Sequence, residues 1–331
     1  MLLLVKPLTL GIRKPVSWFL TESGRRFSMV VIGGTGIACS FARFAPNTFF
    51  LDKYKDFVHN YVNGKPAELK KELQDRFSKC LDTLNIPDQH RKLIAPFSVF
   101  GYDLFNAGSI NSKFGVAIGI PVNFSYKSMD DLVKEDIKVN QKSVDWTSET
   151  GKKLADALIL PEKVQEFAIC REIIMTQNYK FMFDSSYPFL SIFFVYSFAQ
   201  ALNMKFNFYN KPVMMRVFLY TILGMFGSGL YFLMKDMTQV HYEVETDKKL
   251  CELGIDYIES GKIFYEKLLN RNQALYELMG REGKQKYSKL GNENFFIRQP
   301  RIALVHRKLF FEQSLNEAKG AEAEDQNNTS I

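Results

Sequence analysis

The chain has 331 residues, 46% of them hydrophobic and 14% aromatic, with a net charge of +7. This length suits one or two domains, and the basic balance points to either nucleic acid or a membrane. The four cysteines form no CxxC pair and the four histidines are scattered, so the sequence contains no zinc finger and no sequence-local metal site. The cysteines are expected to be isolated thiols, since a disulfide framework is unusual in a chain of this size.

Two long uncharged runs lie close together in the second half of the chain. Residues 185–204 and 217–234 contain 20 and 18 residues without a charge. About 20 mostly apolar residues cross the hydrocarbon core of a bilayer. The pair therefore predicts a membrane hairpin, with spans at 185–204 and 213–234 joined by a basic loop at 205–212. A buried helix of a soluble core is the alternative for each run.

A third and shorter span is predicted at residues 27–45. Its uncharged part is flanked by Arg26 and Arg43 and is diluted by glycines. The string GGTGIA resembles a dinucleotide-binding turn, but the strand and helix context that such a turn needs is missing, and Pro46 interrupts the next stretch of chain. Small residues let helices approach closely, so six glycines of the first and third spans are helix-packing candidates. These are Gly33, Gly34, Gly36, Gly224, Gly227 and Gly229.

The short basic flanks predict the orientation. Residues 1–26 carry five basic residues and one acid, and the loop 205–212 carries two lysines and no acid. The positive-inside rule then places both on the inner side, with residues 46–184 and 235–317 outside. The net charge is explained without nucleic acid. The basic, nearly acid-free start resembles a mitochondrial import segment, and an uncleaved anchor of the endoplasmic reticulum is the alternative.

The segment 46–184 is predicted to be a domain of helices and short strands. An amphipathic helix is expected at 66–84, strands within 97–124, a further short strand at 139–146, and a helix at 161–183 that runs into the second span. The apolar face of the first helix comprises Leu69, Leu73, Phe77 and Leu81. Turns are expected at Asn106–Gly108 and at Pro121.

The C-terminal region 235–317 is predicted to be helical and to pack on that domain. A long amphipathic helix is expected at 238–279. Its apolar stripe comprises Leu250, Leu253, Tyr257, Ile258, Gly261, Phe264, Tyr265 and Leu268. The tail 318–331 has little apolar content and is expected to be disordered.

Two short strings on either side of the hairpin resemble a zinc-peptidase layout. HtpX-like membrane metallopeptidases place HExxH before a transmembrane hairpin and ExxxD after it. Here Arg171, Glu172 and Met175 stand at the first motif, and Glu243 and Asp247 at the second. A guanidinium repels a cation and a thioether is a poor substitute for imidazole, so no zinc site is predicted. A degenerate scaffold and chance similarity both remain open, and on the second interpretation these side chains form ordinary ion pairs.

Longer strings resemble the transmembrane protein 177 family. They are GIPVNF at 119–124, SVDW at 143–146, EKVQEFAICREI at 162–173, SGKIFYEKLLNRNQALYELMGREGKQKY at 260–287, and Gly291-Asn292. The resemblance covers residues 25–300. It implies an inner mitochondrial membrane protein that acts in the biogenesis of cytochrome c oxidase, associates with the assembly chaperone of subunit II, and has its soluble portions in the intermembrane space. It implies no catalytic residue.

The expected fold is an α+β membrane protein with three transmembrane helices, a mostly helical soluble part and a small β-sheet, with a degenerate zincin scaffold as one interpretation. The expected function is a non-enzymatic assembly or scaffold factor without cofactor or metal. Its partners would be subunit II, the chaperone of that subunit and the lipid bilayer. A membrane zinc peptidase with residual activity is the main alternative. A transporter or channel is disfavoured because three spans make a poor pathway and no acidic or basic residue sits in the middle of a span.

Overall fold

The computed structural model describes residue 18, residues 21–134 and residues 137–329. The chain divides into two compact units. The helical unit consists of Met1–Ser40 and Tyr187–Tyr231, and the α+β unit of Phe41–Ser186 and Phe232–Ile331. Most of the basic segment 1–26 therefore lies outside the described residues.

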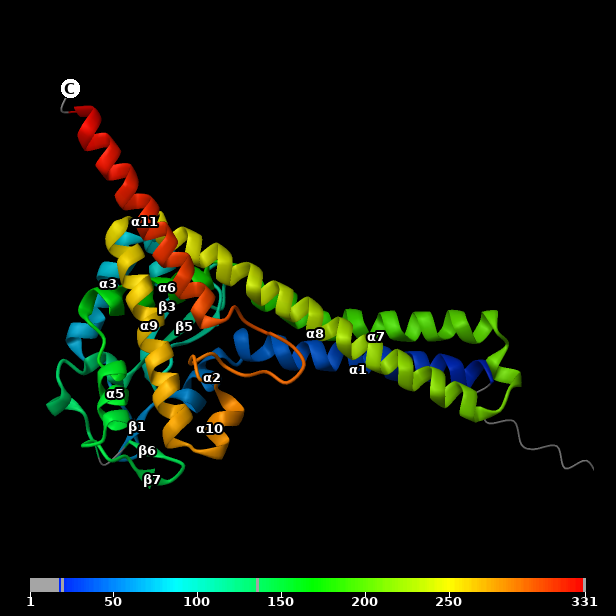
Figure 1. Cartoon of the computed structure of the whole chain (residues 1–331). Coiled ribbons are helices and arrows are strands. Elements are labelled where there is room, and N and C mark those ends of the chain that lie inside the picture. The colour runs from blue at the N-terminus through cyan, green and yellow to red at the C-terminus, as the bar shows by residue number, and fades with distance from the viewer. Residues whose placement is uncertain (1–17, 19–20, 135–136, 330–331) are drawn as a thin grey trace, which may run out of the picture. The chain divides into compact units, whose positions relative to one another are not determined.

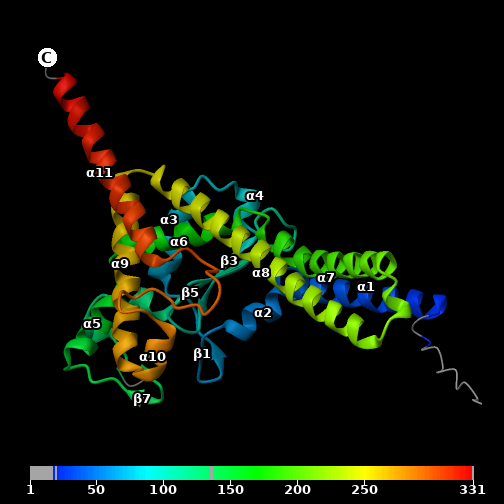
Figure 2. The ribbon, with the colours of Figure 1, turned by 45° about the vertical axis from the view of Figure 1, so that its right-hand side comes forward.

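Three long helices contribute to the helical unit: α1 (Glu22–Phe44), α7 (Lys180–Lys205) and α8 (Val213–Cys251). They run side by side in both views (Figures 1 and 2). The backbone N–H of Phe189 in α7 donates to the Ser40 hydroxyl of α1 at 3.2 Å. The Tyr209 ring, in the loop that joins α7 to α8, lies 5.7 Å from the guanidinium of Arg25 and 5.7 Å from that of Arg216. The start of α1 and this loop therefore lie at the same end of the unit.

Two of the six candidate glycines lie at helix contacts. A Cβ at Gly36 would lie 3.1 Å from the Phe189 ring, and one at Gly227 would collide with the Val195 side chain. Both contacts are with α7, which is the kind of close approach that small residues permit. The remaining four meet nothing within 4 Å and so are free to face a partner: Gly33, Gly34, Gly224 and Gly229.

Two helical segments are long and apolar enough to cross a membrane. They are Glu22–Asn47, which is α1 continued by the 3-10 turn η2 (Ala45–Asn47), and α8. Only 6% and 11% of their apolar stretches are buried within the protein, so neither is a core helix of this chain. The second predicted span lies in α7, which has 26 residues but is not among these two candidates. Two of the three predicted spans are thus identified as candidates.

The α+β unit contains a three-stranded sheet in the order β3 (Ile94–Val99), β5 (Val116–Pro121), β4 (Phe105–Gly108). β3 and β5 are parallel, and β4 pairs antiparallel with β5, with Asn106 opposite Ile118. The central strand β5 is buried throughout, as expected for a strand covered on both faces. Two small hairpins, β1 (Tyr61–Val62) with β2 (Lys65–Pro66) and β6 (Lys138–Val139) with β7 (Lys142–Ser143), lie apart from this sheet.

The α+β unit contains further helices. They are α2 (Leu51–Val58), α3 (Lys71–Thr83), α4 (Asp88–Arg91), α5 (Glu149–Leu158), α6 (Glu162–Thr176), α9 (Ile255–Leu278), α10 (Arg281–Lys286) and α11 (Leu304–Thr329), with 3-10 turns η3 (Val122–Ser125) and η4 (Met129–Asp131). The α2 helix contacts β5, α6 contacts β4 and β5, and α9 contacts α5, α6 and α11 (Figure 1). The mostly helical architecture with a small sheet is as predicted.

The main core is built around aromatic side chains of α6, α9 and α11. Phe167 lies edge-on to Phe311 with ring centroids 5.3 Å apart, and Tyr265 stacks on Phe311 at 5.7 Å. A methyl group at Gly261 would lie 2.6 Å from Phe311 ring atoms and 2.8 Å from Phe167. The predicted apolar positions of both amphipathic helices lie in this core or pack against it. A glycine is therefore required where α9 crosses these two rings.

Two predicted helices are each broken. The helix expected at 161–183 ends at Thr176, and α7 begins at Lys180, whose N–H donates to the Asn178 side chain at 2.9 Å. The helix expected at 238–279 is instead the end of α8 followed by α9, because Gly254 adopts a φ of +114° between them. Such a φ suits glycine and ends a helix. These residues cap or break helices locally, which the apolar period alone does not reveal.

Three further expectations are corrected. Asn106–Gly108 forms β4 and not a turn. Residues 139–146 contain part of a tight hairpin, in which Asn140 and Gln141 have φ of 51° and 63°, as a two-residue hairpin turn requires. The tail at 318–329 is helical as the end of α11. Residues 318–329 contain no apolar residue larger than alanine, but their alanines, glutamates and lysine favour continuation of a helix that has already begun.

The close packing at Gly261 predicts a stability effect. Replacing Gly261 with alanine should lower the free energy of unfolding by about 1–3 kcal/mol, because the added methyl group overpacks the aromatic core. Thermal unfolding of the detergent-solubilised chain measures this loss. Gly320→Ala is the matched control in α11, where nothing lies within 4 Å. Equal melting temperatures for the two variants would contradict the packing described.

Candidate functional site

The Arg171-Glu172 pair lies on the buried side of α6. The Arg171 guanidinium forms an ion pair with the Glu172 carboxylate, which also accepts a hydrogen bond from the Asn106 amide of β4. Glu172 is only 3% exposed. One turn further along α6, the Met175 sulfur accepts a hydrogen bond from the Thr246 hydroxyl of α8 at 3.1 Å. The helix thus directs the Glu172 carboxylate toward β4 and the thioether toward α8.

The two acids of α8 are also buried and have their own partners. Glu243 is 2% exposed and accepts from the Gln239 amide at 2.7 Å and from the Ile302 backbone N–H at 3.0 Å. Asp247, one turn later, is 3% exposed and accepts from the Tyr265 hydroxyl of α9 at 3.2 Å. A buried carboxylate is stable only when it is paired and hydrogen-bonded, and both of these are.

Arg307 of α11 completes the cluster. Its guanidinium donates two hydrogen bonds to Asp247, at 2.7 and 2.6 Å, and a third nitrogen lies 3.8 Å from Glu243. The same guanidinium lies 4.6 Å from the centre of the Tyr265 ring. This bidentate geometry is the strongest form of the arginine–carboxylate interaction. Arg171, Glu172, Glu243, Asp247 and Arg307 are called the ionic cluster below.

The electrostatics of the cluster keep its arginines charged. Burial alone lowers the pKa of Arg171, but its surroundings, which include the carboxylates of Glu172, Asp247 and Glu243, more than offset this, and the pKa is raised overall. Burial also raises the pKa of the Tyr265 hydroxyl, which therefore stays protonated and can donate to Asp247. The site consequently holds two fixed cations opposite three carboxylates, all near one another in a low-dielectric interior.

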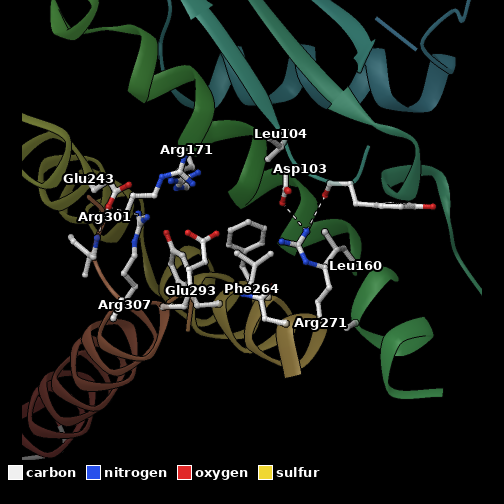
Figure 3. Close-up of a pocket in the computed structure, with 18 of the residues that line it drawn as sticks. Asp103, Leu104, Leu160, Arg171, Glu243, Phe264, Arg271, Glu293, Arg301 and Arg307 are labelled. Atoms are coloured by element: carbon white, nitrogen blue, oxygen red, sulfur yellow. Dashed lines mark hydrogen bonds and ion pairs between the residues drawn. The ribbon is translucent and has the colours of Figure 1, made fainter. Parts of the chain in front are cut away.

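A cavity of about 290 Å³ opens beside the ionic cluster. Arg171, Glu243, Arg301 and Arg307 gather at one end, while Arg271 pairs with Asp103 at the other (Figure 3). That second pair is 2.7 Å long. Phe264 and Glu293 lie between the two ends (Figure 3). The lining is therefore mixed, with charged ends and both an aromatic and an acidic side chain between them, and it is formed by residues from both segments of the α+β unit.

The five sequence-predicted positions do not suit zinc. The structure brings Arg171, Glu172, Met175, Glu243 and Asp247 together from two helices, α6 and α8, that are far apart in the chain. However, the nitrogens of Arg171 and Arg307 fill the space among the carboxylates with positive charge, and neither they nor a thioether replace imidazole as a ligand. No group of three or more His, Cys, Asp or Glu residues within the described parts of the chain has the arrangement of a metal site.

Three members of this site were missed by sequence reasoning. Asn106 was assigned to a turn, Tyr265 only to an apolar stripe, and Arg307 to no feature. Arg307 lies 60 residues from Asp247 in the chain, so no local spacing connects them. The one usable signal was that Glu243 and Asp247 share a face of a helix next to an apolar span, and therefore needed a cation from elsewhere.

The comparisons with known proteins agree on one family. A family model described as transmembrane protein 177 matches residues 19–302. The chain is 28% identical to transmembrane protein 177 of Xenopus laevis over 241 residues, which are 72% of this chain and 77% of that protein. It is also 26% identical to transmembrane protein 177 of Danio rerio, over 84% of this chain and 88% of that protein. The identity to transmembrane protein 177 of Homo sapiens is 26%, over 73% of this chain and 78% of that protein. No solved structure matches significantly.

The pairing of Arg307 predicts a large loss on its removal. Arg307→Met should destabilise the chain by about 3–5 kcal/mol, because it leaves two buried carboxylates without their cation. Denaturant unfolding of the purified chain measures the change. Lys163→Met is the control, since Lys163 pairs with Asp256 on the surface and both side chains are well exposed. It should change stability little. A loss no greater than that of the control would show that Arg307 does not hold the cluster together.

Proposed function

This chain belongs to the transmembrane protein 177 family, and from that membership we propose that it is a non-enzymatic assembly or scaffold factor of the inner mitochondrial membrane. It would support the biogenesis and stability of cytochrome c oxidase subunit II by associating with the assembly chaperone of that subunit. The organelle and the partners follow from the resemblance to the family. The family name and the two candidate membrane helices support the coarser statement, a membrane protein of this family.

The internal pairing of the ionic cluster is the observation that carries the non-enzymatic part of the proposal. A hydrolytic metal site needs ligands with free lone pairs and an open position for water. Here the carboxylates of Glu172, Glu243 and Asp247 accept hydrogen bonds from named protein donors. Carboxylates paired in this way stabilise one arrangement of helices, and each of these three is already engaged by a protein donor, which disfavours the role of a catalytic base. This favours a scaffold over a membrane peptidase with residual activity.

The proposed topology has three spans, with the N-terminus and the loop 205–212 in the matrix and the α+β unit in the intermembrane space. The Tyr209 ring lies near both Arg25 and Arg216, so the basic flanks of α1 and of the hairpin lie at one end of the helical unit. Basic flanks on a common side are what the positive-inside rule expects. With α7 as the third span, the chain would cross the membrane an odd number of times. The two termini would then lie on opposite sides of the membrane.

The lifetime of newly made subunit II in cells tests the proposed function. In cells lacking the protein, pulse-labelled subunit II should decay faster, and the wild-type chain should restore its lifetime. Glu172→Gln, compared at equal protein abundance, should restore it equally, since the carboxylate has no catalytic role. The purified wild-type chain should contain far less than one zinc per molecule by elemental analysis.

Two results would count against these assignments separately. Unaltered decay of subunit II in the deleted cells would remove the assembly role. Stoichiometric zinc together with failure of Glu172→Gln would instead favour the peptidase, whatever the partner.

The open glycines of α1 predict a partner contact. Gly34→Leu adds a bulky side chain where the chain itself has nothing within 4 Å, so the helical unit should form normally while a partner helix is kept away. Co-purification of the subunit II chaperone should fall several-fold. Thr35→Leu, at the neighbouring exposed position of α1, is the control for added bulk. Undiminished co-purification by an inserted Gly34→Leu chain would show that no partner helix packs at this glycine.

A further inference from the structure

The segment between α10 and α11 displays unusually exposed apolar side chains. Phe296 is 99% exposed and Ile297 is 87% exposed, and Leu290 nearby is 64% exposed. An isolated exposed apolar residue needs no explanation, but two adjacent ones at almost full exposure on a loop are costly in water. The exposed loop, defined here as residues 293–301, has the sequence ENFFIRQPR.

This loop is held firmly at its base. The Asn294 backbone N–H donates to the Lys286 carbonyl at 2.8 Å, and Tyr287 and Glu293 form an isolated bridge. At the other end, Ile302 donates to Glu243 of the ionic cluster. Both ends are therefore attached to the body of the α+β unit. The apolar tip is displayed by a fixed base, as a binding element would be.

Arg298 ties the tip to α8. Its guanidinium lies 2.8 Å from the Asp236 carboxylate and 4.3 Å from the centre of the Phe232 ring. Asp236 is largely buried by this contact, with 13% of its side chain exposed. An ion pair combined with a cation–π contact fixes the position of Arg298, and so of the loop, along the axis of α8.

Arg298 contacts α8 at the end of its apolar span. The uncharged run of α8 ends at Met234, between Phe232 and Asp236. Because a helix rises about 1.5 Å per residue, these two contacts lie within about 3 Å of the end of the run along the helix axis. Phe296 and Ile297 are next to the residue attached there. In a bilayer crossed by α8, the loop would therefore lie where hydrocarbon gives way to headgroups.

The charge around the tip suits the same surface. Residues 281–301 contain six basic and two acidic side chains. Apolar tips flanked by lysine and arginine bind the interface of membranes that contain anionic lipids, with the apolar groups below the headgroups and the cations on the phosphates. Among possible occupants, lipid is favoured because α8 itself brings the bilayer to this height.

We propose that the exposed loop is a membrane-interface anchor that inserts Phe296 and Ile297 into the bilayer crossed by α8, with the flanking basic side chains on phospholipid phosphates. This anchor fixes the α+β unit against the membrane surface at a point additional to its helices. It depends on α8 being a span and is independent of the assembly role proposed above.

Fluorescence quenching tests the anchor in the full chain. In a Trp18→Phe, Trp146→Phe background, Phe296→Trp is reconstituted into vesicles of phosphatidylcholine and an anionic phospholipid, with brominated or ordinary acyl chains. Emission should fall about two-fold in the brominated vesicles, as for a ring about 5–10 Å below the headgroup boundary, and iodide should not quench it. Met129→Trp, at an exposed site of η4, is the control and should respond only to iodide.

A second substitution tests the tether. Adding Arg298→Ala to the Phe296→Trp chain should bring quenching by brominated lipid down toward the control level, while Lys289→Ala, which also removes one positive charge, should leave most of it. Quenching of Phe296→Trp by iodide, with none by brominated lipid, would overturn the proposal.

A measurement in mitochondria needs no tryptophan replacement. A photoreactive diazirine amino acid at position 296 of the otherwise unaltered chain should give lipid adducts by mass spectrometry. A single reproducible protein adduct without lipid adducts would assign the loop to a protein partner and refute the membrane anchor.

Discussion

The bidentate pair between Arg307 and Asp247 is the interaction on which the α+β unit depends. It joins the helix that leaves the apolar span to the C-terminal helix, and both partners are almost wholly buried. A charge without its partner is far more costly in such an interior than at a surface. The pair, together with Tyr265 and Glu243, therefore permits one mutual placement of α8, α9 and α11. The aromatic core around Phe311 then packs on that placement.

Periodicity predicted the elements whose structure is decided by burial. Leu73, Phe77 and Leu81 recur at helical spacing and are buried on α3. The same reasoning failed where single residues decide the backbone. Gly254 breaks one long helix through a positive φ, and Asn178 caps the start of α7. These are local events in one or two residues, and an average over an apolar stripe does not detect them.

Only part of the site could be predicted from the sequence. The strings around Arg171 and Asp247 identified residues that the fold does bring together, because helical spacing places each pair on one face. Their partners came from tertiary structure alone: Asn106 from an edge strand and Arg307 from the last helix. A sequence shows that a buried carboxylate needs a cation, but it does not show which of 43 basic residues supplies it.

The unbroken course of α8 has a mechanical consequence. This single helix of 39 residues contains both the apolar span and the two acids of the ionic cluster. Met234 and Glu243 are nine residues apart, or about 14 Å along a rigid rod. The apolar span and the two acids are therefore parts of one element, so a substitution that breaks α8 between Met234 and Glu243 would act on the folding of the α+β unit as well as on the helix itself.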